Sequence, residues 1–383
     1  MLTETSPVRI AIVDPSLFSL PYDIHLCEGL AQPGFEITLF GRAPRPGEEI
    51  SSNAFVFRPW FYSKSERMRA NNHIPKMIKN SVKALEHAID SARLASWVKK
   101  NKFAAVHFQW IALPLFDRFT VKSLKRNGIP VILTVHDTVP FNAAPSSKGQ
   151  NLGWKDTLEL FDAIIVHTQQ SKANLESMGI RVPVFIVAHG LLSFGTIPTS
   201  TKKSEELTFL FFGSIKPYKG LDILLRAFKK ANSAHKAQLR IVGSCSDGPE
   251  QIESLIKELE IGDSVRFEPR FFADSEVPAI LSQSDVVVFP YRRIDGSGAL
   301  LTALTYRKPV IASDVGMFRE LLVDPSALFA PNSVDALAEK IGELIDNPVL
   351  VESLKTLSTQ TAANIPTWEQ IGSTTAKIYE DAR

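Results

Sequence analysis

The chain has 383 residues, a length typical of two domains of ordinary size. A hydrophobic content of 44%, a charged content of 22% and a net charge of +2 indicate a soluble globular protein and exclude a disordered or fibrous one. The two cysteines, Cys27 and Cys245, lie far apart, and no apolar run approaches the roughly 18 residues of a membrane span, so we expect a cytoplasmic protein without disulfides.

The first half of the chain alternates short apolar segments with segments of helical period, which is typical of a parallel sheet with helices on both faces. The predicted strands cover residues 9–14, 36–40, 55–59, 104–109, 131–136, 163–167 and 184–188. Between the third and fourth of these, residues 76–100 predict an amphipathic helix with Ile78, Val82, Leu85 and Ile89 on one stripe.

The region around this helix is strongly basic. Residues 64–102 hold ten Lys/Arg and three Asp/Glu, residues 1–195 hold 22 against 16, and the remainder holds 21 against 25. Such a cluster is either a solvated helix face or a surface that binds an anionic membrane, with each nearby Lys or Arg contributing about 1 kcal/mol. No recognised nucleic-acid motif accompanies the charge, so nucleic acid is not expected as a partner.

Residues 191–206 interrupt the alternation with Pro, Gly, Ser and Thr and predict a linker. The alternation then restarts, with predicted strands at 207–212, 238–243, 264–268, 285–290 and 309–313. Residues 367–382 predict a last helix with Trp368 and Tyr379 as packing anchors. We therefore expect two doubly wound, Rossmann-like α/β domains, residues 1–195 and 196–366, and a C-terminal helix at 367–383 that packs back toward the first domain.

Ligands of open parallel sheets bind beyond the carboxyl ends of the strands, and several histidines fall at such ends. His136, His167 and His189 each follow or close a predicted strand, and His107 lies inside one. A histidine in this place is more often a structural hydrogen-bonding residue than a catalytic one, which is our interpretation of His167 and His189. His107 fits a structural role and a ligand contact equally well.

The segment 207–220 runs from an apolar strand through the turn GSIKPYKG into an amphipathic helix. Backbone N–H groups at a helix start, reinforced by a lysine, form an anion site, and phosphate is the usual anion. Gly213, Ser214, Lys216 and Lys219 are the candidate contacts. Alone, the turn would be equally consistent with two solvated lysines.

A second turn of the same kind, Asp295-Gly296-Ser297-Gly298, follows the strand at 285–290 and also opens a helix. Its two glycines let a ligand approach the backbone, and Ser297 suits an N-cap or a phosphate donor. Two anion-binding helix starts in one sheet favour a diphosphate site over two surface turns.

Arg292 and Arg293 lie just before this second turn. They are candidates, with His107, for contacts to a phosphate or to an acidic acceptor. The alternative is that one arginine is solvated and the other forms an ion pair, and the sequence leaves both interpretations open.

In this order the elements resemble the retaining glycosyltransferases of the GT-B fold, specifically family four, the glycosyl transferases group 1. The resemblance covers nearly the whole chain and rests on the segments GSIKPYKG, IVGSCSDGP, DVVVFPYRR and PVIASDVGMFRELL, with LTVHD and FIVAHG in the first half. It implies two domains that face each other across a cleft, the first binding the acceptor and the second the nucleotide-sugar donor. It also implies that His136 and Asp295 contact the donor sugar at the catalytic centre, because they match the family's strand-end histidine and first glutamate.

Three departures from the family pattern matter. The usual pair of glutamates, eight residues apart, appears as Asp295 and Ala303, so the group that normally holds the ribose is missing. The basic residue after the first glycine is Ser214, and Lys216 is expected to supply its charge. The N-terminal glycine pair is replaced by DPSLFSLPYDIH, so no contact is carried over to that loop.

The expected function is the transfer of a hexose from a nucleotide sugar, most plausibly a UDP- or GDP-sugar, to a glycan or lipid-linked acceptor in bacterial polysaccharide synthesis. No Asp-x-Asp sequence occurs, so we expect neither a metal nor a cofactor, with lysines and the helix dipole holding the diphosphate. The protein would be cytoplasmic or peripheral on the inner face of the membrane.

Two alternatives remain. A GT-B sugar-nucleotide epimerase would need paired carboxylates for acid–base work, which the sequence does not reveal. A non-catalytic GT-B scaffold is suggested by the missing glutamate, although the retained Lys219, Asp295, glycine turn and His136 argue against it. A dinucleotide dehydrogenase is excluded, since RIAIVDPSLFSLP has no Gly-x-Gly-x-x-Gly.

Overall fold

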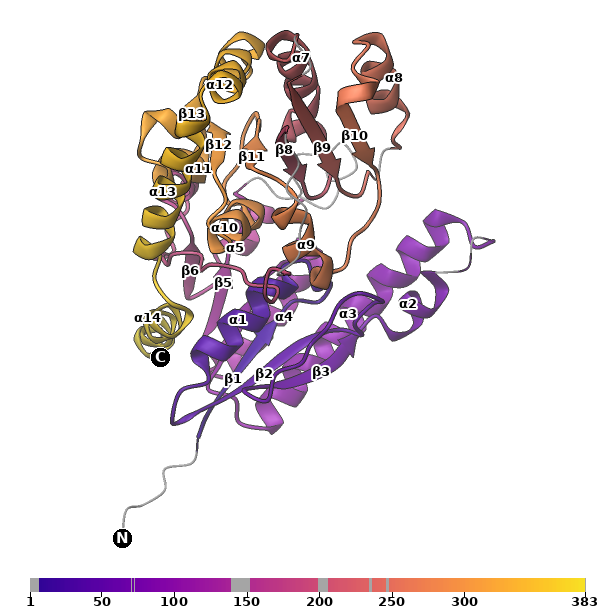
Figure 1. Ribbon diagram of the computed structural model, residues 1–383. Coiled ribbons are helices and arrows are strands. Elements are labelled where there is room, and N and C mark those ends of the chain that lie inside the picture. Colours follow the sequence, from indigo (N-terminus) through magenta and orange to yellow (C-terminus); the bar gives the residue numbers. More distant parts are fainter. Residues whose placement is uncertain are drawn as a thin grey trace. The chain divides into compact units, whose positions relative to one another are not determined.

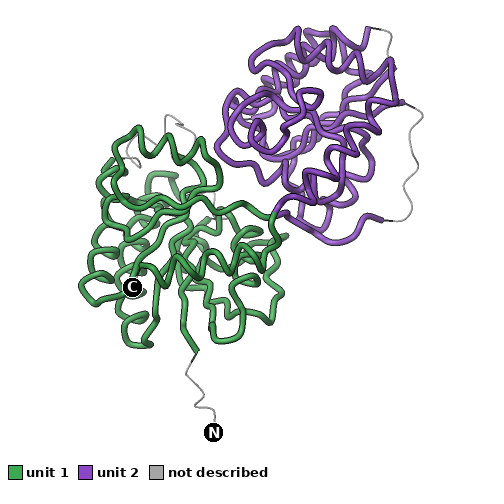
Figure 2. The backbone as a smooth tube through the Cα atoms, turned by 90° about the vertical axis from the view of Figure 1, so that its left-hand side faces the viewer, with its two compact units in different colours: residues 1–190, 366–383 green, residues 191–365 purple. Residues whose placement is uncertain are grey.

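The computed structural model describes residues 7–69, 71, 73–138, 152–198, 206–233, 236–245 and 248–382. The chain divides into two compact units, drawn in green and purple in Figure 2. Unit 1 comprises Met1–Gly190 and Pro366–Arg383, and unit 2 comprises Leu191–Ile365. The final stretch of the chain therefore belongs to the same unit as the first.

Unit 1 is a parallel sheet of seven strands in the order β3-β2-β1-β4-β5-β6-β7 (Figure 1). Its elements are β1 (Val8–Val13), α1 (Leu20–Leu30), β2 (Phe35–Arg42), β3 (Val56–Phe61), α2 (Ser63–Arg69), α3 (Lys76–Lys100), β4 (Ala105–Phe108), α4 (Pro114–Arg126), β5 (Val131–Thr134), α5 (Trp154–Leu158), β6 (Ala163–Val166), α6 (Gln169–Ser177), β7 (Val184–Ile186) and α14 (Trp368–Asp381). The order reverses between β1 and β4, where ligands of doubly wound sheets bind.

The strands of unit 1 are apolar on both faces because helices cover both. Ala11 and Val13 of β1 pack in one cluster with Leu94 of α3 and Val121 of α4. Ile10 and Ile12 point to the opposite face and join residues of α1 and α14. Near-continuous apolar strands of this kind are typical of a parallel sheet buried on both sides.

Helix α14 packs against α1 at unusually close range. A Cβ atom on Gly29 would collide with the carbonyl of Trp368, and one on Gly372 would collide with the carbonyl of Gly29. Further along α14, the Tyr379 hydroxyl lies 2.7 Å from Nδ1 of His107 in β4. The last helix thus completes the core of unit 1.

Unit 2 is a parallel sheet in the order β10-β9-β8-β11-β12-β13, which reverses between β8 and β11. Its elements are β8 (Leu207–Phe212), η3 (Pro217–Lys219), α7 (Leu221–Ala231), β9 (Ala237–Val242), α8 (Glu250–Glu258), η4 (Gly262–Ser264), β10 (Val265–Glu268), η5 (Asp274–Glu276), α9 (Val277–Ser282), β11 (Val286–Phe289), α10 (Gly298–Thr305), β12 (Val310–Ser313), α11 (Gly316–Leu321), η6 (Pro325–Ala327), β13 (Leu328–Phe329), α12 (Val334–Asp346) and α13 (Pro348–Asn364).

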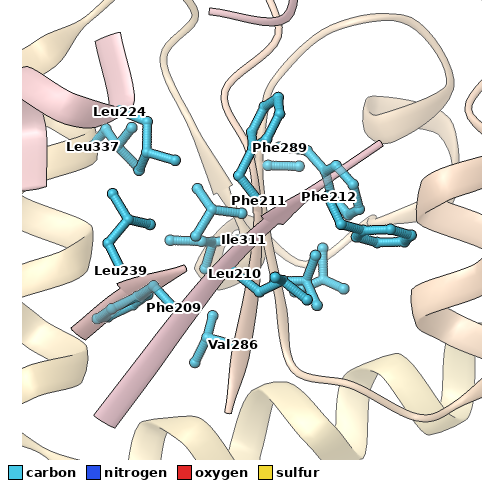
Figure 3. Packing of buried hydrophobic residues seen from close by; sticks show 14 of the residues in the cluster. Phe209, Leu210, Phe211, Phe212, Leu224, Leu239, Val286, Phe289, Ile311 and Leu337 are labelled. Carbon is cyan, nitrogen blue, oxygen red and sulfur yellow. The ribbon is translucent and has the colours of Figure 1, made fainter. Parts of the chain in front are cut away.

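Aromatic side chains of β8 pack on both faces of the unit 2 sheet (Figure 3). The ring of Phe209 lies 6.3 Å from that of Phe228 in α7, whereas Phe212 lies 6.3 Å from Phe289 in β11. The turn that follows Phe212 is therefore held by a rigid, buried strand.

The expected fold class, two doubly wound α/β domains, is confirmed. Each predicted strand is present within about two residues of its expected ends, and only the two-residue β13 was not predicted. Of the predicted linker, residues 199–205 lie outside the described residues, and the others form neither helix nor strand. Among the described residues, no helix is both long and apolar enough to cross a membrane.

The apolar stripe of α3 faces solvent, whereas a helix that packs by its apolar side would turn this stripe toward the core. Ile78, Leu85 and Ile89 are exposed, whereas the buried side carries His87, Leu94 and other residues. Helix α3 is held by the apolar packing of its buried side, which includes Leu94, and by a polar contact in which His87 Nε2 lies 2.6 Å from Asp117 Oδ1 of α4. The hydrophobic period predicted where the helix lies, but it did not indicate which side of the helix packs against the sheet.

Candidate functional site

Residues 218–220 of the first predicted anion-binding turn contact residues 290–292, which precede the second turn, at the β8–β11 switch point of unit 2. The backbone N–H of Arg292 donates to the Tyr218 carbonyl at 2.7 Å. Gly220 has a φ of +65°, and a Cβ atom there would collide with the Pro290 carbonyl, so only glycine allows this contact. Segments about 75 residues apart thus form one continuous surface at the carboxyl ends of the strands.

Lys219 points back to the first glycine of its turn. Its side chain is only 9% exposed, and Nζ lies 3.4 Å from the position that a Cβ on Gly213 would take. Nζ also lies 5.2 Å from the ring centroid of Tyr291. A largely buried ammonium beside a glycine turn is a strong partner for an anion, because little water competes for it.

Tyr291, which sequence reasoning did not single out, lies beside Lys219 at the end of β11. It is 1% exposed, and its hydroxyl has no hydrogen-bond partner among the described residues. Burial raises the pKa of Tyr291 above its usual value, so the phenol stays neutral and can donate. The only sequence signal was an aromatic residue directly after the β11 strand end.

Ser297 caps helix α10. Its Oγ accepts a hydrogen bond from the Leu300 N–H at 3.2 Å, and the side chain is buried. Of the two roles that the sequence allowed, the structure places the hydroxyl as N-cap, while Gly296 and Gly298 on either side are half-buried. The backbone at the start of α10 remains suited to an anion.

Asp295 and residue 303 occupy different environments. Asp295 is half-buried in the turn before α10. Ala303 is fully buried in the hydrophobic cluster of unit 2, so that this position offers no polar group. An alanine fits because α10 packs this side against the core.

Lys216, Arg292 and Arg293 line a cavity of about 800 Å³ between η3, α7 and α8, and Lys219 is not among its lining residues. Arg292 forms an ion pair with Asp222, with N–O distances of 3.0 and 2.7 Å, and holds the pKa of Asp222 below its usual value against the effect of burial. Arg293 is exposed. Of the two arginines, Arg292 therefore forms the ion pair that one interpretation of the sequence allowed.

The corresponding edge of unit 1 is built around the loop after β1. Asp14 accepts hydrogen bonds from the Ser16 and Ser19 N–H groups at 3.1 and 3.0 Å, and Ser19 Oγ bridges to Asp23 at 3.1 Å. Burial raises the pKa of both carboxyls, and the charge of Asp14 raises that of Asp23 further. These carboxyls, both fully buried, hold the loop in place rather than face a ligand.

His136 lies at the end of β5 beside this loop. Trp110 stacks on its ring, with centroids 5.2 Å apart and an interplanar angle of 17°, and Trp110 Nε1 donates to Ser19 Oγ at 3.0 Å. His136 Nε2 lies 3.2 Å from Gln109 Oε1. Removal from water lowers the pKa of His136 well below its usual range, and the neighbouring His167 adds to the effect, so the ring is neutral at pH 7.

His107 and His167 are buried and bonded within unit 1. His107 is fully buried, with Nδ1 2.7 Å from the Tyr379 hydroxyl and Nε2 2.7 Å from Thr134 Oγ1. Burial lowers the pKa of His107 to about 3 and that of His167 to about 4. In this structure His107 serves the packing of α14, and neither ring nitrogen faces a ligand.

His189 is half-buried, and its Nδ1 lies 2.8 Å from the Gly190 carbonyl. With His136 and His167 it surrounds the ring of Tyr22, at centroid distances of 4.8, 4.9 and 5.2 Å respectively. The histidine cluster holds no group of three or more side chains arranged for a metal, nor does any other part of the described chain.

Two family models match the chain. Residues 24–191 match Glycosyltransferase Family 4, and residues 196–362 match Glycosyl transferases group 1. Among solved structures, a sucrose-phosphate synthase from Thermosynechococcus elongatus superposes with a TM-score of 0.77 at 20% identity over 98% of both chains. HepE of Anabaena, solved in complex with UDP and glucose, superposes with a TM-score of 0.75 at 14% identity, over 98% of this chain and all of that one.

A curated relative is the GDP-mannose:glycolipid 4-beta-D-mannosyltransferase of Xanthomonas campestris, 27% identical over 194 residues, which are 49% of this chain and 51% of the relative. The chain spans about half to three-fifths of the length of the first curated relatives that it matches. The structural likenesses lie under 25% identity and show the fold, which is that of GT-B proteins.

Proposed function

Because the chain belongs to the glycosyl transferases group 1 family of GT-B proteins, we propose that it transfers a hexose, with retention of configuration, from a nucleotide sugar to a glycan or lipid-linked acceptor. The observation that carries the proposal is the contact between the segments of the two glycine turns at the β8–β11 switch point, with the largely buried Lys219 beside Gly213 and Tyr291. The role in bacterial polysaccharide synthesis and the UDP or GDP donor are part of the same proposal.

The donor diphosphate would bind to unit 2. Lys219, the amides of residues 296–298 and the neutral Tyr291 hydroxyl would be donors at one strand edge, and Lys216 would add a second positive charge from the neighbouring cavity. The Ser297 N–H donates to Met317 Sδ at 3.4 Å and would exchange this contact for the ligand. Cleavage of the sugar–phosphate bond develops negative charge on the leaving diphosphate, and donors fixed in advance stabilise that charge without reorganisation. In this arrangement no metal or cofactor is needed.

Asp295 and His136 are proposed as the catalytic residues, each as a contact to the donor sugar. In a retaining transfer the acceptor hydroxyl attacks from the face that the diphosphate leaves, and a leaving phosphate oxygen takes its proton. No separate carboxylate base is then required, which suits a chain whose Asp14 and Asp23 are buried in loop contacts.

The acceptor is proposed to be a membrane glycan or glycolipid, with the protein peripheral to the membrane. The basic character of residues 64–102 supports this, and the name of the Xanthomonas relative gives a glycolipid acceptor and a GDP-mannose donor for that protein. HepE was solved in complex with UDP, which supports a UDP-sugar as the donor to the same degree.

A direct test is calorimetric titration with UDP, GDP and ADP, followed by incubation of the tight-binding nucleotide's sugars with a lipid-linked acceptor. Binding of one nucleoside diphosphate and a product with the donor's anomeric configuration, read by NMR, are expected. A product of inverted configuration would refute retention. Nucleotide binding without any transfer or epimerisation would favour the scaffold, and interconversion of the sugar nucleotide itself would favour the epimerase.

A further inference from the structure

Helix α3 presents an apolar stripe to solvent. Ile78, Leu85 and Ile89 are spaced seven and four residues apart, which places them on one side of the helix, and Leu85 is 63% exposed. Met77 at the start of the helix is 78% exposed. The opposite side of α3 is the one that packs in the core.

The neighbouring helix α4 also carries exposed apolar side chains. Leu115, Phe116 and Phe119 of α4 are exposed, and Phe119 is 67% exposed. The buried contact between His87 and Asp117 joins the two helices. Both helices cover the same face of the unit 1 sheet (Figure 1). Seven large apolar side chains on two adjacent helices exceed the scattered exposure that a monomer surface normally shows.

Charge around this surface is positive because the acidic side chains of α3 are used inside unit 1. Glu86 accepts hydrogen bonds from the Lys64 and Ser65 N–H groups at 2.7 Å each, at the start of α2. Asp90 accepts from the Tyr62 N–H at 3.0 Å. The exposed or half-exposed basic residues of α3 are Lys76, Lys79, Lys83, Arg93, Lys99 and Lys100, of which Lys83 contacts the Tyr62 ring.

We propose that the outward stripe of α3, formed by Ile78, Leu85 and Ile89 with Met77, enters the acyl–headgroup boundary of an anionic bilayer. An apolar stripe flanked by lysines is the pattern of helices that lie in a membrane interface. The lysines contact anionic headgroups while the apolar side chains are buried. A second copy of the chain is a poorer occupant, since it would bring two basic rims together.

This inference deepens the membrane part of the proposed function, but its measurement does not depend on sugar transfer. The measurement distinguishes insertion of the apolar side chains into the bilayer from adsorption that depends on charge alone. Adsorbed protein leaves the vesicle when salt screens the lysines, whereas inserted apolar side chains retain part of the binding.

The first experiment compares two double variants of equal net charge. Leu85→Ser with Ile89→Ser removes the stripe, and Val323→Ser with Val349→Ser removes two exposed apolar residues of unit 2 as a matched control. On phosphatidylglycerol vesicles the stripe variant should bind at least about tenfold more weakly than wild type, and the control should not change. Thermal midpoints and nucleotide affinity of both variants report folding and the donor site separately. Equal binding by wild type and stripe variant overturns the inference.

The second experiment places a polarity-sensitive dye on Leu85→Cys, in a background where Cys245→Ser removes the half-buried thiol and the buried Cys27 remains. Emission should shift to the blue on phosphatidylglycerol vesicles and be quenched by spin-labelled acyl chains. A dye on Val349→Cys should not respond. Binding without a shift at residue 85 means adsorption only, and a shift that follows protein concentration without lipid means self-association; either result overturns the inference.

Discussion

The Nδ1 atom of His136 lies 3.3 Å from Nε2 of His167, whose own Nδ1 lies 2.9 Å from the Val187 carbonyl oxygen. A carbonyl only accepts, so Nδ1 of His167 carries the proton. The lowered pKa keeps His167 neutral, and its Nε2 must therefore accept from His136. His136 is thereby fixed with a lone pair on Nε2, and the Gln109 amide must present its NH₂ group there.

The pH dependence of stability should reveal the neutral His167. Its pKa is about 4 when folded and near 6.5 when unfolded, so between these values the unfolded chain binds the extra proton and stability falls as pH is lowered. From pH 6.5 to 4, wild type should lose about 3 kcal/mol more than His167→Gln. Asp14 and Asp23, whose raised pKa values act in the opposite direction, are common to both proteins and cancel in the difference. Denaturant titrations that run parallel at all pH values would contradict this assignment.

Lys219→Ala should weaken nucleoside diphosphate binding by about 1.5–3 kcal/mol, the range of a hydrogen bond to a charged group. The reason is the burial of this ammonium beside Gly213. Lys229→Ala, which removes an exposed lysine of α7, is the control and should leave affinity unchanged. Calorimetry that finds equal dissociation constants for both variants would remove Lys219 from the site.

His136→Ala should lower turnover far more than it weakens binding of free nucleotide, because His136 belongs to unit 1 and the anion-binding turns to unit 2. His107→Gln is a useful comparison, since the structure predicts a loss of stability rather than a selective loss of kcat. Steady-state kinetics at saturating donor measures both. A reduced nucleotide affinity at unchanged kcat would place His136 in the nucleotide site instead.

Transfer should proceed in EDTA without added magnesium or manganese. In the proposed site, Lys219, Lys216 and the start of α10 would supply the positive partners that a metal would otherwise provide at the diphosphate. Activity would be measured with chelated enzyme and a soluble acceptor, so that effects on lipid are avoided. An absolute requirement for a divalent ion, restored by one metal and not by others, is the opposing result.

Neutralising Lys76, Lys79, Lys99 and Lys100 together should reduce binding to anionic vesicles and make the remainder less dependent on salt, without lowering nucleotide affinity. Lys83 is a poor member of this set, although the sequence places it on the same helix. Its ammonium lies 4.6 Å from the Tyr62 ring centroid and 3.3 Å from Ser16 Oγ, and burial lowers its pKa. Lys83→Gln alone is therefore a control: it should lower stability but leave vesicle binding unchanged. A loss of vesicle sedimentation with Lys83→Gln alone would contradict this placement of Lys83.

The order of elements was predictable from sequence because parallel strands and their crossover helices each leave a strong local pattern, as in β8 and α7. The two glycine turns were predictable for the same reason: each is a short contiguous segment. What needed the structure was contact between distant segments. Asp222 pairs with Arg292, 70 residues away, and nothing in either local sequence indicates that partner.

Side-chain direction was the second limit of the sequence. Leu85 and Ile89 define a clear helical period, yet the period alone does not say whether that side faces protein or solvent. His107 lies inside β4 and His136 follows the end of β5, and the bonds to Tyr379 and Thr134 show that His107 is the buried one. Roles for His136, Asp295 and the lysines stay predictions that the experiments above address.

The packing of α14 onto α1 has a consequence for synthesis on the ribosome. Residues that fill the contact at Gly29 and reach His107 are made only after all of unit 2. Unit 2 is one continuous segment and can fold while it is synthesised. The N-terminal part of unit 1 is synthesised earlier but lacks α14, so the surface of α1 and β4 that α14 covers stays exposed until the last helix is made. A purified chain truncated after residue 365 should therefore resist protease in unit 2 while unit 1 remains susceptible, and the chain that includes residues 366–383 should resist protease in both units.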